Sequence, residues 1–170
     1  ILLITGASGG VGSAATQLAK ARGARVIGVT GDEKQQSVLD AGADQTLIRG
    51  SSLQTALGQN AVDVVIDLVG GPDWPELLNI LRPFGRYAVS GAIAGPIVEL
   101  DLRTLYLKDQ WLLGCTVLDD GVFSRLVHLI EKGEIKPLVA RCFALASLSE
   151  AQAFFLKKQF TGKLVIDMAL

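Results

Sequence analysis

The eight residues from Thr5 to Gly12, "TGASGGVG", have the types and spacing best suited to chemistry in this sequence. Read as A-x-G-x-x-G, they form a dinucleotide-binding loop with alanine in place of the first glycine. Read as G-x-S-x-G, they form the nucleophile elbow of a serine hydrolase. Read as T-G-x-x-x-G-x-G, they form a glycine loop that accompanies a catalytic tyrosine elsewhere in a chain. The rest of the sequence must decide between these three interpretations.

The hydrolase interpretation needs a histidine base in a loop after the serine. The sequence contains one histidine, His128, in the middle of a predicted helix and on the face that it shares with Ser124 and Glu131. We therefore expect His128 to be an exposed surface residue. Ser8 is then expected to belong to a phosphate-binding loop and not to act as a nucleophile.

The third pattern resembles the short-chain dehydrogenases, whose chemistry needs a tyrosine acid and a lysine four residues later. Tyr87 is followed at that spacing by Gly91, and Tyr106 is followed by Lys108 after only two residues. The pair is missing from both places, so a relative of this family remains only an alternative.

The dinucleotide loop needs only a strand before it and a helix after it, and the sequence predicts both. Gly9 and Gly10 would let the backbone approach a pyrophosphate, and Gly12 would let the helix pack closely on the sheet. The free amides and the dipole at the helix start would attract the phosphate charge. A glycine-rich turn without a ligand is the alternative.

Side chains at the ends of the next two strands indicate which nicotinamide cofactor would bind. Thr30 stands about where NAD-specific sites carry an acidic residue. Its hydroxyl, with the cations of Lys34 and Arg49, favours the 2′-phosphate of NADP. Asp32 and Glu33 lie between them and either could contact a ribose, so NAD is the less favoured cofactor. The alternative for Lys34 is a solvated helix residue.

The elements that must position these residues alternate between strands and helices. This alternation predicts βαβ units and a doubly wound α/β fold, in which helices cover both faces of a parallel sheet. We expect strands at 1–5, 25–29, 45–48, 62–67, 86–90 and 112–117, helices near 11–22, 32–41, 73–81 and 122–132, and a loop at 90–100. After Pro137 the pattern changes to a strand near 139–144, a helix near 148–157 and a final strand. We therefore expect a Rossmann domain over residues 1–136 and a separate segment over 137–170.

Composition sets limits on the partners and setting of the protein. The 170 residues carry a net charge of -1 and no basic stripe, which argues against a nucleic-acid partner. No apolar run is long enough for a membrane helix. Cys115 and Cys142 lie far apart without metal-ligand spacing, so we expect no metal site in this chain, a reducing setting and a cytoplasmic location.

Five segments carry a likeness that runs in order over nearly the whole chain: "TGASGGVGSAATQLAKARGARVIGVTGDEKQ", "AGAD", "DVVIDLVGG", "LRPFGRYAVSGAIAG" and "TGKLVI". They are similar to the cofactor domain of the medium-chain dehydrogenase/reductases, and most of all to the zinc-independent quinone oxidoreductase branch. The resemblance implies a six-stranded Rossmann sheet. It also implies reversible hydride transfer between NAD(P)H and a quinone, a carbonyl or an activated alkene.

By position, the resemblance assigns the pyrophosphate to the glycine loop and the adenosine ribose phosphate to Thr30, Lys34 and Arg49. It places residues after the fifth strand and in the sixth strand beside the nicotinamide. Of these, Cys115 is expected to be a small buried residue without thiol chemistry, and no catalytic residue is assigned to this chain. The expected cofactor-binding residues are Ser8, Gly9, Gly10, Val11, Gly12, Thr30, Lys34, Arg49, Gly91, Ala92, Cys115 and Thr116.

The family normally carries an amino-terminal, GroES-like substrate domain that this sequence does not include. We therefore expect a piece of a longer enzyme, inactive alone, whose small-molecule substrate, proton donor and any zinc ligands belong mainly to that domain. The segment after Pro137 would fold back toward it and leave partners missing among Phe143, Phe154, Phe155 and Phe160. The resemblance also implies a homodimer through the sixth strands. A nucleotide-binding module without turnover is the competing hypothesis.

Overall fold

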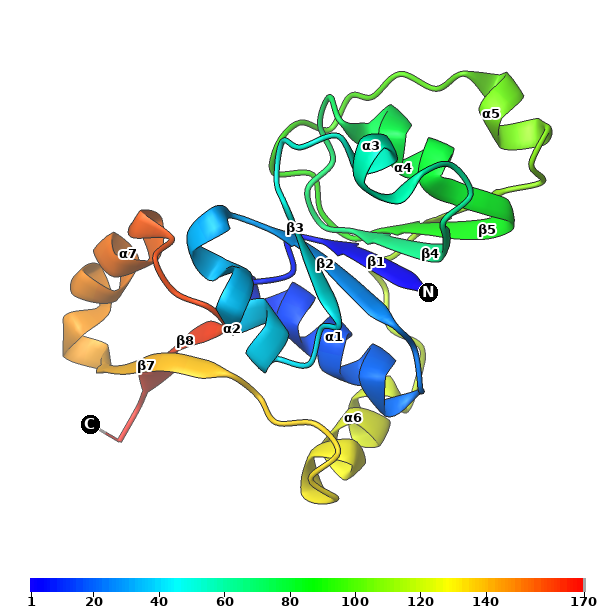
Figure 1. Cartoon of the computed structure of the whole chain (residues 1–170). Coiled ribbons are helices and arrows are strands. Elements are labelled where there is room, and N and C mark those ends of the chain that lie inside the picture. Colours follow the sequence, from blue (N-terminus) through cyan, green and yellow to red (C-terminus); the bar gives the residue numbers. More distant parts are fainter. Residues whose placement is uncertain (170) are drawn as a thin grey trace.

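The computed structural model describes residues 1–169, and six parallel strands form its main sheet (Figure 1). The strands are β1 (Leu2–Thr5), β2 (Val26–Thr30), β3 (Gln45–Ile48), β4 (Val62–Asp67), β5 (Leu81–Val89) and β6 (Trp111–Gly114). Their order is β3-β2-β1-β4-β5-β6, and every neighbouring pair is parallel. The predicted doubly wound, six-stranded sheet is confirmed. The strand order reverses between β1 and β4, where such sheets bind ligands at the carboxyl ends of their strands.

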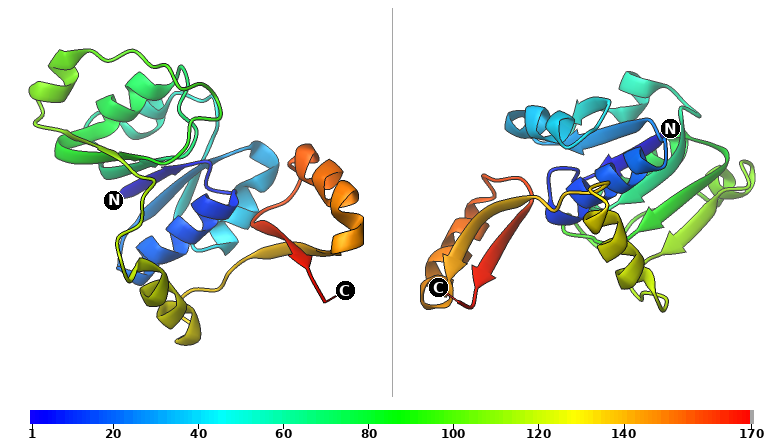
Figure 2. Two further views of the ribbon diagram at one scale, coloured as in Figure 1. Left: turned by 180° about the vertical axis from the view of Figure 1, so that it is seen from behind. Right: turned by 90° about the horizontal axis from the view of Figure 1, so that it is seen from below.

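Helices cover both faces of this sheet (Figures 1 and 2). On one face lie α1 (Gly10–Ala21) and α2 (Gln35–Asp40), the latter preceded by a short 3₁₀ helix, η1 (Asp32–Lys34). On the other face lie α3 (Leu53–Leu57) and α4 (Trp74–Ile80), followed by the outlying α5 (Leu102–Tyr106). The remaining helix of this part, α6 (Val122–Glu131), lies on the side of α1.

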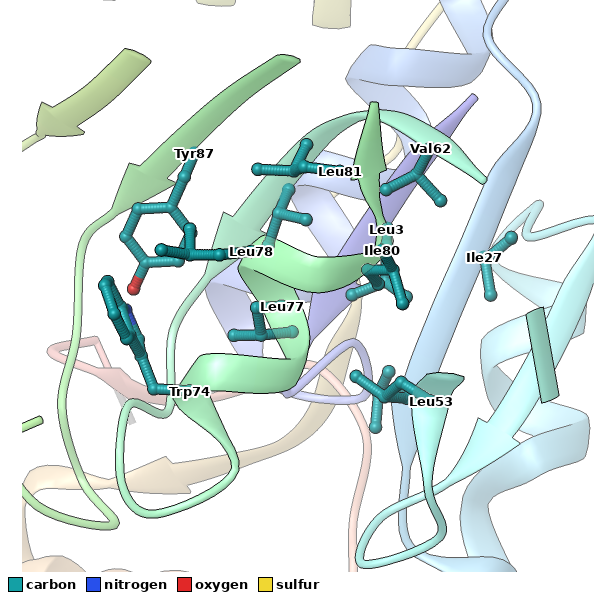
Figure 3. Packing of buried hydrophobic residues seen from close by; sticks show 12 residues of the cluster. Leu3, Ile27, Leu53, Val62, Trp74, Leu77, Leu78, Ile80, Leu81 and Tyr87 are labelled. Atoms are coloured by element: carbon teal, nitrogen blue, oxygen red, sulfur yellow. The ribbon is translucent and has the colours of Figure 1, made fainter. Parts of the chain in front are cut away.

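Two apolar clusters, one on each face, hold these layers together because successive side chains of a strand point to opposite faces. Leu2 and Ile4 of β1 pack with Val38 of α2. Leu3, between them, packs on the opposite face in the cluster that contains Leu78 of α4 (Figure 3). Full burial of one such side chain contributes about 1.5–3 kcal/mol, so the clusters fix the helices on the sheet.

Residues after Pro137 build a second, smaller unit. Its strands β7 (Val139–Ala144) and β8 (Lys163–Asp167) pair in parallel and are joined through η2 (Leu145–Ser147) and α7 (Leu148–Lys157). Figure 2 shows this unit beside the main sheet and not as part of it. The predicted strand, helix and final strand are confirmed. Leu170 lies outside the described residues, and a domain boundary at 136/137 stays a prediction.

The four phenylalanines of this unit form a cluster of their own. Phe143 is buried, and the ring of Phe154 stacks on Phe160 with centroids 5.7 Å apart. Phe155 remains 49% exposed. None of the four belongs to the clusters of the main sheet, as expected. That they lack partners from another domain stays a prediction.

The structure corrects two strand boundaries and adds two short helices. The fifth strand begins at Leu81, so Pro83 lies within β5, near the point where its register with β4 shifts. Proline has no N–H to donate to a regular ladder, so within a strand it is tolerated where the pairing is irregular. The sixth strand ends at Gly114 and not at residue 117, since its one neighbour, β5, ends at Val89. The five-residue helices α3 and α5 were not predicted because so few residues carry no clear helical period.

Candidate functional site

A cleft of about 550 Å³ opens at the carboxyl edge of the main sheet, where β1 to β4 end. Its walls come from the β1–α1 loop, the residues after β2 and β3, the turn after β4 and the loop between α7 and β8. The cleft therefore lies at the point where the strand order reverses. The residues after β2 and β3 form one end of the cleft, and the turn after β4 forms the other.

The β1–α1 loop presents unpaired backbone amides at the start of a twelve-residue helix. Within the described part of the chain, the amides of Val11 and Gly12 have no hydrogen-bond acceptor, and no side chain caps the helix at Gly9. Gly9 itself forms an isolated parallel bridge with Gly162. The first turn of α1 contains no acidic residue, so the partial positive charge of the helix start is not neutralised. Such a helix start can bind a phosphate group.

Gly12 lies beneath this loop and does not line the cleft. A Cβ atom at this position would overlap the carbonyl oxygen of Gly6 and lie 2.7 Å from the Cα atom of Ala7. Only glycine therefore allows α1 to approach the loop so closely and to place its free amides at the cleft.

Thr30 forms part of the cleft wall at the end of β2. Its side chain is only 3% exposed, and its hydroxyl has no hydrogen-bond partner among the described residues. A buried polar group without a partner costs free energy that a ligand can recover. The amide of Arg49 donates to the Thr30 carbonyl at 2.7 Å, which joins the end of β3 to the same wall. This unpaired hydroxyl fits a ribose or phosphate group of a nucleotide.

Four cationic side chains line the same end of the cleft: Lys34, Arg49, Lys157 and Lys158. The ammonium of Lys34 donates to the carbonyl oxygen of Lys158, which joins η1 to the end of α7. The Lys158 ammonium lies 3.2 Å from the ring centre of Phe155, a cation–π contact. The predicted cations at Lys34 and Arg49 are thus accompanied by two lysines, Lys157 and Lys158, that were not predicted as site residues.

Of the two acidic residues that follow β2, Glu33 faces this end of the cleft. Its carboxylate folds back over Gly31, where an added Cβ would lie 3.2 Å from Oε1. Asp32 instead accepts a hydrogen bond from Gln35 at 2.8 Å and does not line the cleft. Glu33 is therefore the acidic residue that a cofactor ribose would meet.

The loop between α7 and β8 closes one side of the cleft. The amide of Gly162 donates to the carbonyl of Ser8 at 3.2 Å, and the hydroxyls of Ser37 and Thr161 lie 2.7 Å apart. A Cβ atom on Gly10 would lie 2.9 Å from both Cγ and Nζ of Lys163. The Lys163 ammonium therefore lies beside the start of α1, next to the cleft wall but not among its lining residues. Lys163 was not predicted as a site residue because nothing in its own segment indicates so distant a neighbour.

The cleft brings together half of the twelve predicted cofactor residues: Ser8, Gly9, Gly10, Thr30, Lys34 and Arg49. The others do not line it: Val11, Gly12, Gly91, Ala92, Cys115 and Thr116. Cys115 and Thr116 lie beyond the end of β6 and are exposed, so their placement in the sixth strand and the burial of Cys115 were wrong. The chain leaves the sheet there because β6 has no neighbour beyond β5 to prolong it.

A buried carboxylate at the other end of the cleft was not predicted. Asp67, at the end of β4, is 0% exposed and accepts hydrogen bonds from the Thr5 and Tyr87 hydroxyls, each at 2.6 Å. Burial and then the hydrogen bond to Asp67 raise the pKa of Tyr87 above its ordinary value. We call these three residues the Asp67 cluster.

His128 is exposed on α6, as predicted, and does not line the cleft. Within residues 1–169, no three histidine, cysteine, aspartate or glutamate side chains lie together in a way that could hold a metal ion. In the same residues, no helix has both the length and the apolar character needed to cross a membrane.

The sequence is similar to known dehydrogenases and reductases. The family model described as Zinc-binding dehydrogenase matches residues 10–132. The acryloyl-coenzyme A reductase of Sulfurisphaera tokodaii is 34% identical over 167 residues, which are 98% of this chain and 50% of the relative. The quinone oxidoreductase of Sus scrofa is 29% identical over 179 residues, 98% of this chain and 54% of the relative. The chain thus spans about half the length of the curated relatives it matches.

Solved structures of similar proteins share this fold. A putative alcohol dehydrogenase from Sinorhizobium meliloti superposes with a TM-score of 0.90 at 50% identity, covering 98% of this chain and 48% of that one. The Bacillus subtilis protein yhfP, solved with NAD bound, superposes with a TM-score of 0.84 at 26% identity, covering 98% and 54%.

Proposed function

Because this chain belongs to the zinc-binding dehydrogenase family and forms the cofactor-binding domain of a medium-chain dehydrogenase/reductase, we propose that it binds NADP(H) in an oxidoreductase. The reaction would be hydride transfer between the nicotinamide and a quinone, a carbonyl or an activated alkene. One observation carries the proposal. A single cleft at the reversal point of the sheet combines the unpaired amides of α1 with the unpaired, buried hydroxyl of Thr30.

Different residues along the cleft would bind different parts of the cofactor. The amides at the start of α1 and the ammonium of Lys163 would hold the pyrophosphate. Thr30, Lys34 and Arg49 would hold the adenosine ribose and its phosphate. When bound, the nicotinamide supplies the hydride-transfer chemistry, and this chain binds and orients it.

The charge around Thr30 supports NADP over NAD. Cations outnumber the single carboxylate, that of Glu33, among the residues that line this end. A 2′-phosphate would gain charge-assisted hydrogen bonds from lysine or arginine there. Glu33 supports the competing choice, because a carboxylate accepts hydrogen bonds from an unmodified ribose. The relative solved with NAD shows that this family also contains proteins that bind the unphosphorylated dinucleotide.

The substrate and the setting belong to the proposal as well. The names of the relatives, a quinone oxidoreductase and an acryloyl-coenzyme A reductase, support a quinone or an activated alkene as substrate. We propose that residues outside this chain hold most of that substrate, because the relatives are about twice as long. A cytoplasmic location stays a prediction, with which the free thiols of Cys115 and Cys142 agree.

The competing function is a module that holds the nucleotide without turnover, because the same cleft would serve both. Oxidation of NADPH by the full-length protein, followed optically with simple quinones, aldehydes and unsaturated thioesters, separates the two. We expect catalytic turnover with at least one of these classes. Saturable NADPH binding without turnover over the whole panel would favour the module.

We also propose a homodimer through β6. This strand is at the edge of the sheet, and its residues Trp111, Leu112 and Leu113 are 58%, 39% and 41% exposed. An apolar edge strand with free backbone groups is a template for pairing with another chain. Pairing with β6 of a second copy would cover these side chains and satisfy those groups.

A further inference from the structure

We infer that Asp67 is a positioning residue for the nicotinamide half of the dinucleotide, an inference that rests on the proposed function. Asp67 belongs to the cleft wall but is 0% exposed, so it would act on a ligand mainly through the residues that it holds. Its carboxylate lies where β1, β4 and β5 end. It accepts hydrogen bonds from Thr5 in β1, from Val69 after β4 and from Tyr87 in β5.

Four donors surround this carboxylate. Oδ1 accepts from the Thr5 hydroxyl at 2.6 Å and from the amides of Val69 and Gly70 at 2.9 and 3.1 Å. Oδ2 accepts from the Tyr87 hydroxyl at 2.6 Å. None of these donors is a cation, and Asp67 forms no ion pair with another described residue. Burying a carboxylate without a counter-ion costs free energy, which its hydrogen bonds must offset. The burial of Asp67 therefore depends on all four donors.

These hydrogen bonds fix two turns at once. Thr5 immediately precedes Gly6, which has a φ of 63° and begins the phosphate-binding loop. The Thr5 hydroxyl also accepts the amide of Leu68 at 2.9 Å, so it joins the ends of β1 and β4. Gly70 has a φ of 63° as well, and a Cβ there would lie 2.8 Å from the carbonyl oxygen of Gly95. The Asp67 cluster therefore sets the positions of the turns at Gly6 and Gly70. It also sets the position of the loop around Gly95, against which the Gly70 turn packs.

Both turns form the wall at the end of the cleft that lies away from Thr30. Gly6, Val69 and Gly70 line this wall, together with Ile93 from the loop after β5. The adenosine half would occupy the end with Thr30 and the cations, and the pyrophosphate would lie at Ser8 to Gly10 between the two ends. The remaining half of the dinucleotide, the nicotinamide riboside, would therefore meet the turns that Asp67 holds.

Two ligands distinguish positioning from general loss of structure. NADPH occupies the whole cleft, whereas 2′,5′-ADP carries only the adenosine half. We expect Asp67→Asn to weaken NADPH about tenfold or more, because an amide cannot accept from all four donors. Binding of 2′,5′-ADP should change less than about twofold, because that end of the cleft does not depend on the cluster. Calorimetric titration of the 170-residue chain measures both dissociation constants.

Tyr87→Phe provides the second variant in case Asp67→Asn does not fold, as circular dichroism would show. It removes the one donor to Oδ2 and keeps the ring, so a loss of about threefold in NADPH affinity is expected. The matched control is Tyr106→Phe on α5, where the tyrosine is 61% exposed and no change is expected.

The outcomes separate this inference from the proposed function. If a folded variant binds both ligands more weakly by the same factor, or binds both as wild type does, the ratio of the two dissociation constants is unchanged. Either result would overturn the positioning role alone. A wild-type chain that binds neither ligand saturably would overturn the proposed function and, with it, this inference.

Discussion

At Gly12 the fold leaves no space for a side chain, because the carbonyl of Gly6 and the backbone of Ala7 occupy it. Gly12→Ala should therefore lower the free energy of unfolding by about 1–3 kcal/mol, the usual cost of overpacking a rigid site. It should also weaken NADPH binding, because α1 must move away from the loop. Urea unfolding and titration measure the two effects.

Gly114→Ala is the matched control for Gly12→Ala. An added Cβ at Gly114 meets nothing within 4 Å, and its φ is not positive. Its unfolding free energy should change by less than about 0.5 kcal/mol. An equal effect of the two substitutions would show that close packing does not explain the need for Gly12.

Lys163 gives a second prediction at the residue scale. Its ammonium lies beside the start of α1, so Lys163→Met should weaken NADPH binding about fivefold by removing one exposed charge next to the phosphate site. High salt should reduce this difference. Lys132→Met, at the end of α6, is the control with no expected effect. Identical affinities of wild type and Lys163→Met at low salt would remove this lysine from the site.

Individual residues were predicted unevenly, for a physical reason. Thr30 and Lys34 follow directly from their place after a strand, because strand ends gather at one edge of a parallel sheet. Asp67 takes its role from Thr5, 62 residues away, and Tyr87, 20 residues away, so no local pattern indicates it. Cys115 was misplaced because the sequence does not show where a neighbouring strand stops.

At the scale of elements, Asp44 joins α1 to the start of β2. Its carboxylate accepts from the Lys20 ammonium at 2.8 and 2.9 Å and from the amide of Val26 at 2.7 Å. The hydrogen bond from Lys20, followed by that from Val26, lowers the pKa of Asp44 below 3.8. The stabilising effect of the carboxylate is therefore present above pH 3.8 and is lost as the pH falls through the lowered pKa.

Asp44→Asn tests this link. The variant should melt at a lower temperature than wild type at neutral pH, and the difference should shrink as the pH falls below 3.8. Asp40→Asn, an exposed neighbour at the end of α2, is the control. Melting curves followed by circular dichroism give the comparison. A difference that stays constant down to acid pH would exclude the ionised carboxylate as its source.

Elements with a strong period were predicted well and short ones were not. All six strands of the main sheet and both strands of the smaller unit were expected. The signal is clearest for β1 and β2, which are buried throughout, because buried parallel strands are nearly continuous apolar runs. The helices α3 and α5 have five residues each, which are too few to show a clear helical period. Their existence could be established only from the assembled fold.

For the whole molecule, the exposed edge at β6 predicts association. Leu113→Lys should convert a dimer into a monomer in sedimentation velocity, because a charge would be buried against the second copy. Phe123→Lys, at a side chain 70% exposed on α6, should leave the oligomeric state unchanged. A wild-type chain that stays monomeric at high concentration would contradict the proposed dimer.

The central claim is that one cleft at the reversal point of the sheet binds a phosphorylated nicotinamide dinucleotide. Titration of the 170-residue chain with NADPH and with NADH tests it most directly, with Lys34→Ala measured beside the wild type. We expect saturable binding of one ligand per chain, NADPH binding about tenfold tighter than NADH, and most of that preference lost in Lys34→Ala. Equal affinities for the two cofactors that Lys34→Ala does not change would contradict the cofactor assignment, and no saturable binding of either would contradict the claim itself.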